Sequence, residues 1–507
     1  MINKNRAQMC AWTVSRKNVN VLVPVFLLVC FFVSLGFARS AGAQAYPDSS
    51  APAQNSSGSQ APNSGPAPAD ELRPSYPGEP FNSPPVEATI GPARLRVYGT
   101  ILFNASFSDT AEVGEEVPLW PLPSSSTVSF PDGTTKPAGQ VHDTIFTARQ
   151  SILGVVLNPA QTPASGWKPA ALVEIDFFGT RPVDTNIPQS RVLNQPRLRV
   201  AYFQLEKGDF KLVAGQDKII ISPLDPVSLS HVAVPLGFAA GDLFGWLPQV
   251  RVDYTHKFAS TTTLFQFGVL RPSFSDPRLA SSGTQTTTGD LPAVGTSLDS
   301  SPGLGERASQ PFYQARVAVS HPFRGSTTTV GVGGHYGKER LGAVQEANSW
   351  AFAFDLRVPI QRHLIFRAEG YMGSNLIPFG GGVLQGIATV PTAANAPPAP
   401  PFTQFRKIGD AGGWGEFTIP VTPRNVFYLG GSTDDPVNKD LLPSSTRQKN
   451  SFVWASYFRK LTREVTLGAE WSNWQFHTIT FVGTTPAGRS PAYGRGNVVN
   501  IALAYQF

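Results

Sequence analysis

The stretch "RLRVYGTILFNASF" (residues 94–107) alternates between apolar and polar side chains along most of its length. Its odd positions include Leu95 and Ile101, whereas its even positions include Arg96 and Asn104. A period of two residues places these two groups on opposite faces of an extended strand. The pattern therefore predicts a β-strand with one apolar face and one charged or polar face.

The same alternation recurs along the chain up to its last residue. It returns in "ALVEIDF", "RLRVAYFQ", "QVRVDYTHKF", "QARVAVS", "WAFAFDLRV" and "HLIFRAEGYM". Short links such as "EKGD", "TPRN" and "LTRE" alternate with long links, notably residues 271–310 and 373–405. The 47 Gly and 46 Pro residues disfavour helices and favour turns. These features predict an all-β fold with about sixteen strands, within a range of roughly fourteen to eighteen.

The position of the charges favours a transmembrane β-barrel over a soluble β-sandwich. Arginine occurs on the polar face of many of these segments, and a sandwich gives no reason for that shared phase. In a transmembrane antiparallel barrel, the apolar face contacts lipid, the charged face lines a water-filled lumen, and closure pairs the backbone groups. Aromatic residues near strand ends would form belts at the two membrane surfaces. These aromatic residues are Trp350, Trp414, Trp454, Tyr457, Trp471, Trp474 and Tyr505.

The first 45 residues predict a signal peptide. They contain a basic segment, the apolar run "VNVLVPVFLLVCFFVSLGF" and the small-residue exit "AGAQA", and an uncleaved membrane anchor is the alternative. The segment holds five basic and no acidic residues, so its removal lowers the formal charge from +6 to +1. Both cysteines, Cys10 and Cys30, lie in it as well. The mature chain therefore has no charge excess that would bind nucleic acid and no thiol for disulfides or catalysis.

Residues 46–92 are dominated by Pro, Ser, Ala, Gly and Asn, as in "SSAPAQNSSGSQAPNSGPAPA". Such a composition buries too little apolar surface to offset its loss of conformational entropy. We expect a disordered linker over 46–92 and the barrel over 93–507.

The chain ends on "NVVNIALAYQF", with Ile501, Leu503, Tyr505 and Phe507 in one phase. This ending resembles the C-terminal signal of bacterial outer-membrane proteins, which the barrel-assembly machinery reads. A segment with one apolar face can add to an exposed strand edge. We therefore expect Tyr505 and Phe507 to act in assembly, and we expect the protein in the bacterial outer membrane; a soluble domain that ends in Phe is the alternative.

Part of the chain resembles the DcaP-like outer-membrane porins. The similarity covers residues 94–258 and includes "RLRVYGTILFN", "ARQSILGV", "ALVEIDFFG", "PRLRVAYFQLEKGDFKLVAGQDKI" and "WLPQVRVDYTH". The resemblance implies a sixteen-stranded barrel, usually a homotrimer, that admits small and often anionic solutes such as dicarboxylates. Family members often carry a helical coiled-coil segment before the barrel, where this chain has a Pro/Ser-rich stretch.

The alternation assigns charged side chains to the lumen. The basic ones are Arg94, Arg96, Arg149, Arg197, Arg199, Arg251, Arg316, Arg357 and Arg367, and the acidic ones are Glu174, Asp176, Asp253, Asp355, Glu369 and Glu470. Nine basic against six acidic side chains predict a net positive wall that attracts anions. The alternative is that the charges pair across neighbouring strands and only stiffen the wall.

The segment "SPLDPVSLSHVAVPLGFAAGDLFGWLP" follows the fifth predicted strand and is too long and apolar for an ordinary exposed loop. By analogy with general porins, we expect an inward loop near residues 218–247 that constricts the lumen. It would contribute the side chains of Asp217, Lys218, Asp225, His231 and Asp242. Alternatively, the loop packs at a subunit interface or over the mouth.

These features together predict a porin, a passive diffusion channel for small hydrophilic solutes with a preference for anions. The alternatives are a substrate-specific channel with a defined binding site, and an outer-membrane enzyme or structural barrel. The seven His residues are scattered, and no G-x-S-x-G motif is present. We therefore expect no catalytic residues, no metal and no cofactor.

Overall fold

The computed structural model describes most of the chain after residue 85. The described residues are 86–114, 116–161, 163–179, 195–274, 278–279, 285–286, 303–342, 345–361, 363–391 and 402–507. The expected signal peptide and most of the expected linker lie outside the described residues. No helix among the described residues is long and apolar enough to cross a membrane.

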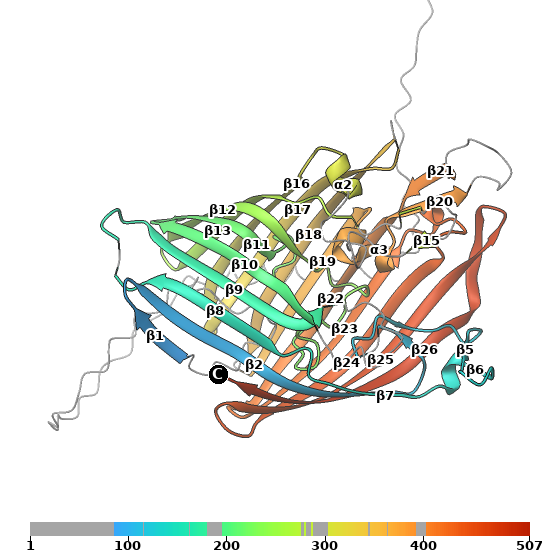
Figure 1. The fold of residues 1–507 in the computed structure, drawn as a ribbon, viewed down its shortest axis with the longest axis horizontal. Helices are drawn as coiled ribbons and strands as arrows, with labels where there is room; N and C mark the ends of the chain where they lie inside the picture. The colour runs from blue at the N-terminus through green and yellow to red at the C-terminus, as the bar shows by residue number, and fades with distance from the viewer. Residues whose placement is uncertain are drawn as a thin grey trace, which may run out of the picture. The chain divides into compact units, whose positions relative to one another are not determined.

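The main sheet contains 18 strands, of which β1 (Val86–Ile90) and β7 (Asp143–Thr147) are short and pair with β2. The other sixteen form a closed antiparallel barrel, because β2 pairs with β8 on one edge and with β26 on the other (Figure 1). The predicted all-β barrel of about sixteen strands is therefore confirmed. These strands are β2 (Ala93–Ser108), β8 (Ile152–Pro159), β9 (Lys168–Gly179), β10 (Gln195–Lys207), β11 (Phe210–Lys218), β12 (Trp246–Phe258), β13 (Thr261–Leu270), β16 (Phe312–Phe323), β17 (Ser326–Arg340), β18 (Glu346–Gln361), β19 (Leu364–Ser374), β22 (Gly409–Thr422), β23 (Asn425–Pro436), β24 (Arg447–Lys460), β25 (Val465–Val482) and β26 (Thr485–Gln506).

Short elements occur in the connections. They are β3 (Glu112–Val113), β4 (Trp120–Pro121), β5 (Thr127–Ser129), β6 (Thr135–Pro137), β14 (Arg278–Leu279), β15 (Gln285–Thr286), β20 (Ile387–Pro391), β21 (Phe402–Lys407), η1 (Ala138–Gln140), α2 (Leu304–Arg307), η2 (Ile377–Phe379), α3 (Gly381–Leu384) and η3 (Asn438–Asp440).

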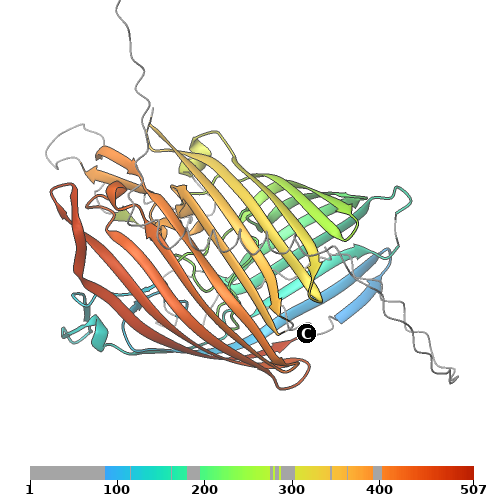
Figure 2. The same cartoon turned by 180° about the vertical axis from the view of Figure 1, so that it is seen from behind.

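The connections alternate between the two rims of the barrel (Figure 2). One rim carries tight turns, such as the turn between β10 and β11, where Gly208 has a φ of +60° that favours glycine. The predicted short links "EKGD", "TPRN" and "LTRE" all lie at this rim, and the long links 271–310 and 373–405 lie at the opposite rim.

The last strand has the two faces that its sequence predicts. On β26, Ile501, Leu503 and Tyr505 are exposed on the outside, whereas Asn500 and Ala502 are fully buried on the inside. The same alternation holds on β2, β9, β12 and β16. The apolar face therefore points out of the barrel and the polar face points into it.

The strand β1 completes the seam of the barrel. β26 pairs with β2 from Thr100 to Ser108, and β1 pairs with β2 from Ala93 to Val97. Since β8 occupies the other edge of β2 at this height, β1 lies on the edge that β26 leaves open. The strand β1 thus lies inside the range 46–92 that the composition assigns to a linker.

Three of the predicted belt residues lie inside the barrel instead. Trp350 and Trp471 are exposed on the outer face, but Trp414, Trp454 and Trp474 are at most 3% exposed and point inward. They form a hydrophobic cluster with residues of the long β11–β12 connection. The belt assignment is wrong for these three because apolar residues of this connection, such as Leu236 and Ala240, pack against them inside the barrel.

Candidate functional site

The connection between β11 and β12, residues 219–245, lies inside the barrel and is called the inward loop here. It follows the fifth of the sixteen strands, and almost all of its residues are buried. Inward-pointing side chains of the wall donate hydrogen bonds to it and accept hydrogen bonds from it. The loop therefore occupies part of the barrel interior.

One part of the inward loop is held by the wall near β8 and β10. Gln150 Nε2 donates to Ser230 O at 2.8 Å, and Gln150 Oε1 accepts from the backbone N–H groups of Val232 and Ala233 at 3.1 Å each. Arg197 Nη2 donates to Ala233 O at 2.7 Å.

Strands farther around the ring hold another part of the loop. Glu369 on β19 accepts hydrogen bonds from Ser222 Oγ at 2.5 Å and from Leu224 N at 2.6 Å. Glu416 on β22 accepts from Val227 N at 2.9 Å. The loop thus spans the lumen between separate parts of the wall.

Apolar side chains of the inward loop form hydrophobic clusters with inward-facing side chains of the wall. Ile219, Ile220 and Ile221 belong to a cluster that contains Phe312 of the wall strand β16 and also Phe379 of the β19–β22 connection. Other loop residues join two further clusters, with Val227, Leu229 and Val232 in one and Leu236 and Ala240 in the other. Burial of this apolar surface stabilises the inward position of the loop.

Two of the predicted constriction residues lie at the end of β11 rather than in the loop. Asp217 accepts from Arg251 Nη1 at 2.8 Å, and Lys218 Nζ lies 2.7 Å from Asp225 Oδ2. Asp217 and Lys218 keep 16% of their side chains exposed, whereas Asp225 keeps 7%. Asp217 and Lys218 are therefore the predicted constriction residues that face the most water.

The other two predicted constriction residues are buried. His231 Nε2 lies 3.1 Å from Glu470 Oε1 and 3.3 Å from Asn500 Nδ2, and its side chain is fully buried. Asp242 is 1% exposed. Burial, and to a lesser extent the negative charges of Asp225 and Glu369, raise the pKa of Asp242 well above its ordinary value.

Three of the predicted lumen arginines form a cluster next to the inward loop. Arg197 pairs with Asp176 at 2.6 Å, and Arg199 pairs with Glu174 at 2.7 Å and with Asp176 at 2.9 Å. Arg149 pairs with Glu116, which the sequence reasoning did not select.

Aromatic rings order these guanidinium groups. The guanidinium carbon of Arg149 lies 4.0 Å from the centre of the Phe178 ring, and that of Arg197 lies 5.3 Å from the same centre. Trp246 lies in the same way beside Arg197 and Arg199, at 5.1 and 4.5 Å. Cation–π contacts of this kind hold the charged groups in fixed positions.

The remaining predicted arginines are spread around the ring. Arg316 makes two 2.8 Å hydrogen bonds to Asp355, Arg251 pairs with Asp217 and Asp253, and Arg367 pairs with Glu416 at 3.3 Å.

Three of the predicted arginines lie at the rim that carries the tight turns. Arg357 donates to Thr327 O at 2.7 Å, in the hairpin of β16 and β17. Arg94 pairs with Glu87 of β1, and Arg96 lies opposite Glu87 in the same pairing.

Three of the lumenal ion pairs share an asymmetry in exposure. In the pairs Arg149–Glu116, Arg197–Asp176 and Arg367–Glu416, the arginine side chains are 15%, 29% and 16% exposed and the carboxylates 0%. The pair Arg251–Asp217 differs, with 12% and 16%. In the pairs of Arg149, Arg197 and Arg367, the arginine is therefore the partner that contacts water.

The numbers of charges alone do not make the wall positive. The count of nine against six omits carboxylates such as Glu116, Glu416, Asp410 and Asp434, which are also buried inside the barrel. Burial decides which of these charges contact water, and burial could not be inferred from the alternation.

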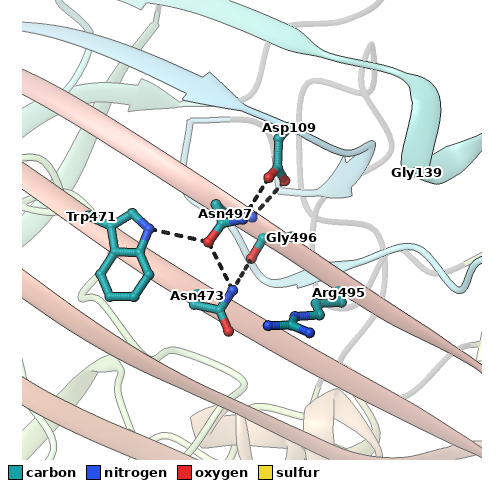
Figure 3. A pocket seen from close by; sticks show the side chains of 7 residues that line it. All are labelled: Asp109, Gly139, Trp471, Asn473, Arg495, Gly496 and Asn497. Carbon is teal, nitrogen blue, oxygen red and sulfur yellow. Dashed lines mark hydrogen bonds between the residues drawn. The ribbon is translucent and has the colours of Figure 1, made fainter.

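A cavity of about 420 Å³ lies outside the lumen, on the outer face of β25 and β26 (Figure 3). Its polar groups contact one another: Asn497 accepts from Trp471 Nε1 at 3.2 Å and from Asn473 Nδ2 at 2.9 Å, and it donates to Asp109 at 2.6 Å. Trp471 is an outward-facing residue of β25, so this cavity is not on a path through the barrel. Among the described residues, no group of three His, Cys, Asp or Glu side chains could hold a metal ion.

Comparison with known proteins supports the fold. No protein-family model matches the chain, and no curated protein matches it. The crystal structure of the outer membrane channel DcaP of Acinetobacter baumannii matches with a TM-score of 0.56 at 15% sequence identity, over 83% of this chain and 99% of that chain. An anion-selective porin from Comamonas acidovorans matches with a TM-score of 0.48 at 10% identity, over 82% of this chain and 100% of that chain. The chain has the porin-like β-barrel fold of the outer-membrane channel DcaP, as its sequence resemblance predicts.

Proposed function

We propose that the protein is a porin of the bacterial outer membrane. Small hydrophilic solutes would cross it by passive diffusion, and small anions such as dicarboxylates would cross faster than cations. The apolar outer face supports the location, because a ring of side chains such as Ile501 and Leu503 suits hydrocarbon and not water. A mature chain that stayed folded and monodisperse in buffer without detergent would contradict this location.

The asymmetry of the lumenal ion pairs carries the proposed anion preference. The side chains of Arg149, Arg197 and Arg367 are partly exposed, whereas those of their carboxylate partners are fully buried. A guanidinium group stays charged at all physiological pH values, and it presents forked donors that match a carboxylate. Anions in the lumen would therefore meet positive charge first.

The inward loop explains why several carboxylates do not cancel this effect. Glu369 and Glu416 direct their oxygen atoms to the backbone N–H groups of Leu224 and Val227 and to a loop hydroxyl. A carboxylate held in this way is satisfied by the protein and is shielded from a passing solute. These acidic groups would anchor the loop rather than select cations.

Recordings of refolded protein in planar bilayers under a salt gradient test the proposal. We expect stable conductance with a reversal potential that shows preference for chloride over potassium, and faster flux of a dicarboxylate than of a diamine of similar size. A reversal potential of the opposite sign would overturn the anion preference, and absence of conductance would overturn the channel itself.

A substrate-specific channel is the second candidate, and one observation favours it. Arg149 and Arg197 lie beside the same Phe178 ring, which holds two guanidinium groups close together as a site for a dicarboxylate. Conductance that one dicarboxylate blocks in a saturable manner would support this reading, whereas linear dependence on solute concentration would leave simple diffusion.

We also propose that the protein is a homotrimer. Phe103, Phe107 and Phe146 form an exposed aromatic group on the outer face of β2 and β7, with ring centres 5.9 and 6.1 Å apart. Such an aromatic surface suits a contact between subunits. Channel closures in three equal steps would support the trimer, and single steps would contradict it.

A further inference from the structure

A second segment of the chain also lies inside the barrel. Residues 375–386 belong to the connection between β19 and β22, contain η2 and α3, and are mostly buried (Figure 1). Ser349 Oγ on β18 donates to Asn375 O at 2.7 Å, and Asn375 Nδ2 donates to Glu339 Oε1 on β17 at 2.6 Å. These contacts place the start of the segment against the inner face of the wall.

This second segment contacts the inward loop directly. Phe244 N donates to Phe379 O at 2.9 Å. A Cβ atom at Gly380 would lie 2.4 Å from the Phe238 ring, so the backbone of one segment touches a side chain of the other. Leu376 and Phe379 are fully buried in the cluster that also contains Ile219–Ile221 side chains. The lumen is thus narrowed by two segments that pack on each other.

The backbone of the second segment is unfavourable in isolation. Gly382, Val383 and Leu384 have φ values of +66°, +50° and +56°. The left-handed region is open to glycine but disfavoured for residues with a Cβ atom, most of all for a β-branched residue such as valine. A conformation of this kind persists where surrounding contacts enforce it.

Two carboxylates of the wall provide such contacts. Asp410 Oδ2 on β22 accepts from Gly382 N at 2.6 Å, and Asp434 Oδ2 on β23 accepts from Val383 N at 2.9 Å. Both carboxylates are at most 3% exposed.

Arg447 provides the other hydrogen bonds that hold this backbone in place. Its Nε donates to Val383 O at 2.7 Å, and its Nη2 donates to Leu384 O at 2.8 Å. Its backbone N donates to Gln385 Oε1 at 3.0 Å, and its backbone O accepts from Gln385 Nε2 at 2.7 Å. One residue of β24 therefore makes four hydrogen bonds to three consecutive residues of the segment.

We infer that the second segment, residues 375–386, forms a second constriction element, which limits the size of the solutes that pass, and that Arg447 is the positioning residue that holds it in the lumen. The inference rests on the proposed function, since it concerns a conducting channel. Without Arg447, the unfavourable backbone relaxes, the segment withdraws, and the lumen widens.

The test is the single-channel conductance of Arg447→Met, together with uptake of sugars of increasing size in a liposome-swelling assay. Methionine keeps an unbranched apolar stem but removes both side-chain donors. We expect a larger conductance, faster uptake of the larger sugars, and about a tenfold or greater rise in the population of the wide state, because two charge-assisted hydrogen bonds are lost.

Arg406→Met is the matched control. Arg406 is exposed on β21, in the same β19–β22 connection, and donates to Lys439 O at 3.0 Å, so its replacement removes one positive charge without touching the segment. We expect the two variants to share one reversal potential and to differ in conductance. Equal conductance in both would overturn the inference while the proposed function stands, whereas a wild-type protein that does not conduct would overturn the proposed function.

Leu384→Gly provides a test that does not depend on the folding of Arg447→Met. Glycine adopts the φ of Leu384 without strain, so the contacts with Arg447 no longer have to offset an unfavourable backbone conformation at this position. We expect fewer transitions to the wide state than in the wild type. A rise in these transitions would mean that the substitution only loosens the structure, and would contradict the inference.

Discussion

Phe507 and Gly99 exchange two backbone hydrogen bonds that close the barrel: Gly99 N donates to Phe507 O at 2.9 Å, and Phe507 N donates to Gly99 O at 3.1 Å. The Phe507 ring also covers Gly99, where a Cβ atom would lie 2.9 Å from Phe507 Cζ and 2.6 Å from Ile152 O. The C-terminal residue and the first long strand therefore fit each other only because position 99 carries no side chain.

We expect Gly99→Val to impair closure of the barrel. Its side chain would meet the Ile152 carbonyl, which belongs to the backbone of the neighbouring strand and cannot move without breaking the pairing. Semi-native electrophoresis, in which a folded barrel and an unfolded chain migrate differently, measures the folded fraction. Gly139→Ala is the control, because a Cβ atom there meets nothing within 4 Å. A fully folded Gly99→Val protein would contradict the proposed role of this contact.

We expect Arg197→Gln and Arg199→Gln to have different effects, although the two residues are neighbours on β10. Arg197 is 29% exposed, so its replacement should lower the anion preference and leave the barrel folded. Arg199 is 1% exposed between Glu174 and Asp176, and removing one partner of a buried ion pair costs about 3–5 kcal/mol. Arg199→Gln should therefore lower the unfolding temperature. Reversal potentials measure the first effect and thermal unfolding measures the second. Equal reversal potentials and equal unfolding temperatures of the two variants would contradict the assignment of ion preference to Arg197 and of stability to Arg199.

We expect Glu369→Ala to loosen the inward loop. The substitution leaves Ser222 Oγ and Leu224 N without their acceptor, and each unsatisfied buried donor costs about 1–3 kcal/mol. Current noise and mean conductance should both rise in single-channel recordings. Glu206→Ala on β10, next to a tight turn, removes the same charge away from the loop and should leave the noise at the wild-type level. Quiet recordings from Glu369→Ala would mean that the loop is held by its apolar contacts alone.

The sequence predicts the wall of this barrel well and its interior less well. Side chains alternate between the two faces of a strand with a period of two residues. The sequence alone therefore places Ile501 on the outer face and Asn500 on the inner face. The same rule places the side chains of Arg197, Arg199 and Arg316 on the inner face of the barrel.

The interior depends on which segments fold back into it, and alternation carries no information on that. Trp414 and Trp474 are of a residue type that is typical of the belts at the membrane surface. Their burial is explained only by the apolar loop residues beside them. Residues 375–386 contain one indication of an inward segment, the apolar and glycine-rich run "NLIPFGGGVLQG" in a long link. The left-handed backbone at Val383 could not be foreseen, because it is imposed by Asp434 and Arg447 from distant strands.

We expect Trp474→Ala to destabilise the protein far more than Trp471→Ala, although the two residues are three positions apart on β25. Trp474 is fully buried and stacks on Phe452 with ring centres 4.0 Å apart, so its removal leaves a cavity that costs about 3–5 kcal/mol. Trp471 is 42% exposed on the outer face and donates one hydrogen bond to Asn497, so its removal should cost much less. Thermal unfolding in detergent, followed by semi-native electrophoresis, measures the difference. If Trp471→Ala unfolds at the lower temperature, the apolar packing inside the barrel contributes less to stability than the outer face does, and the inward loop would not be held by the tryptophans around it.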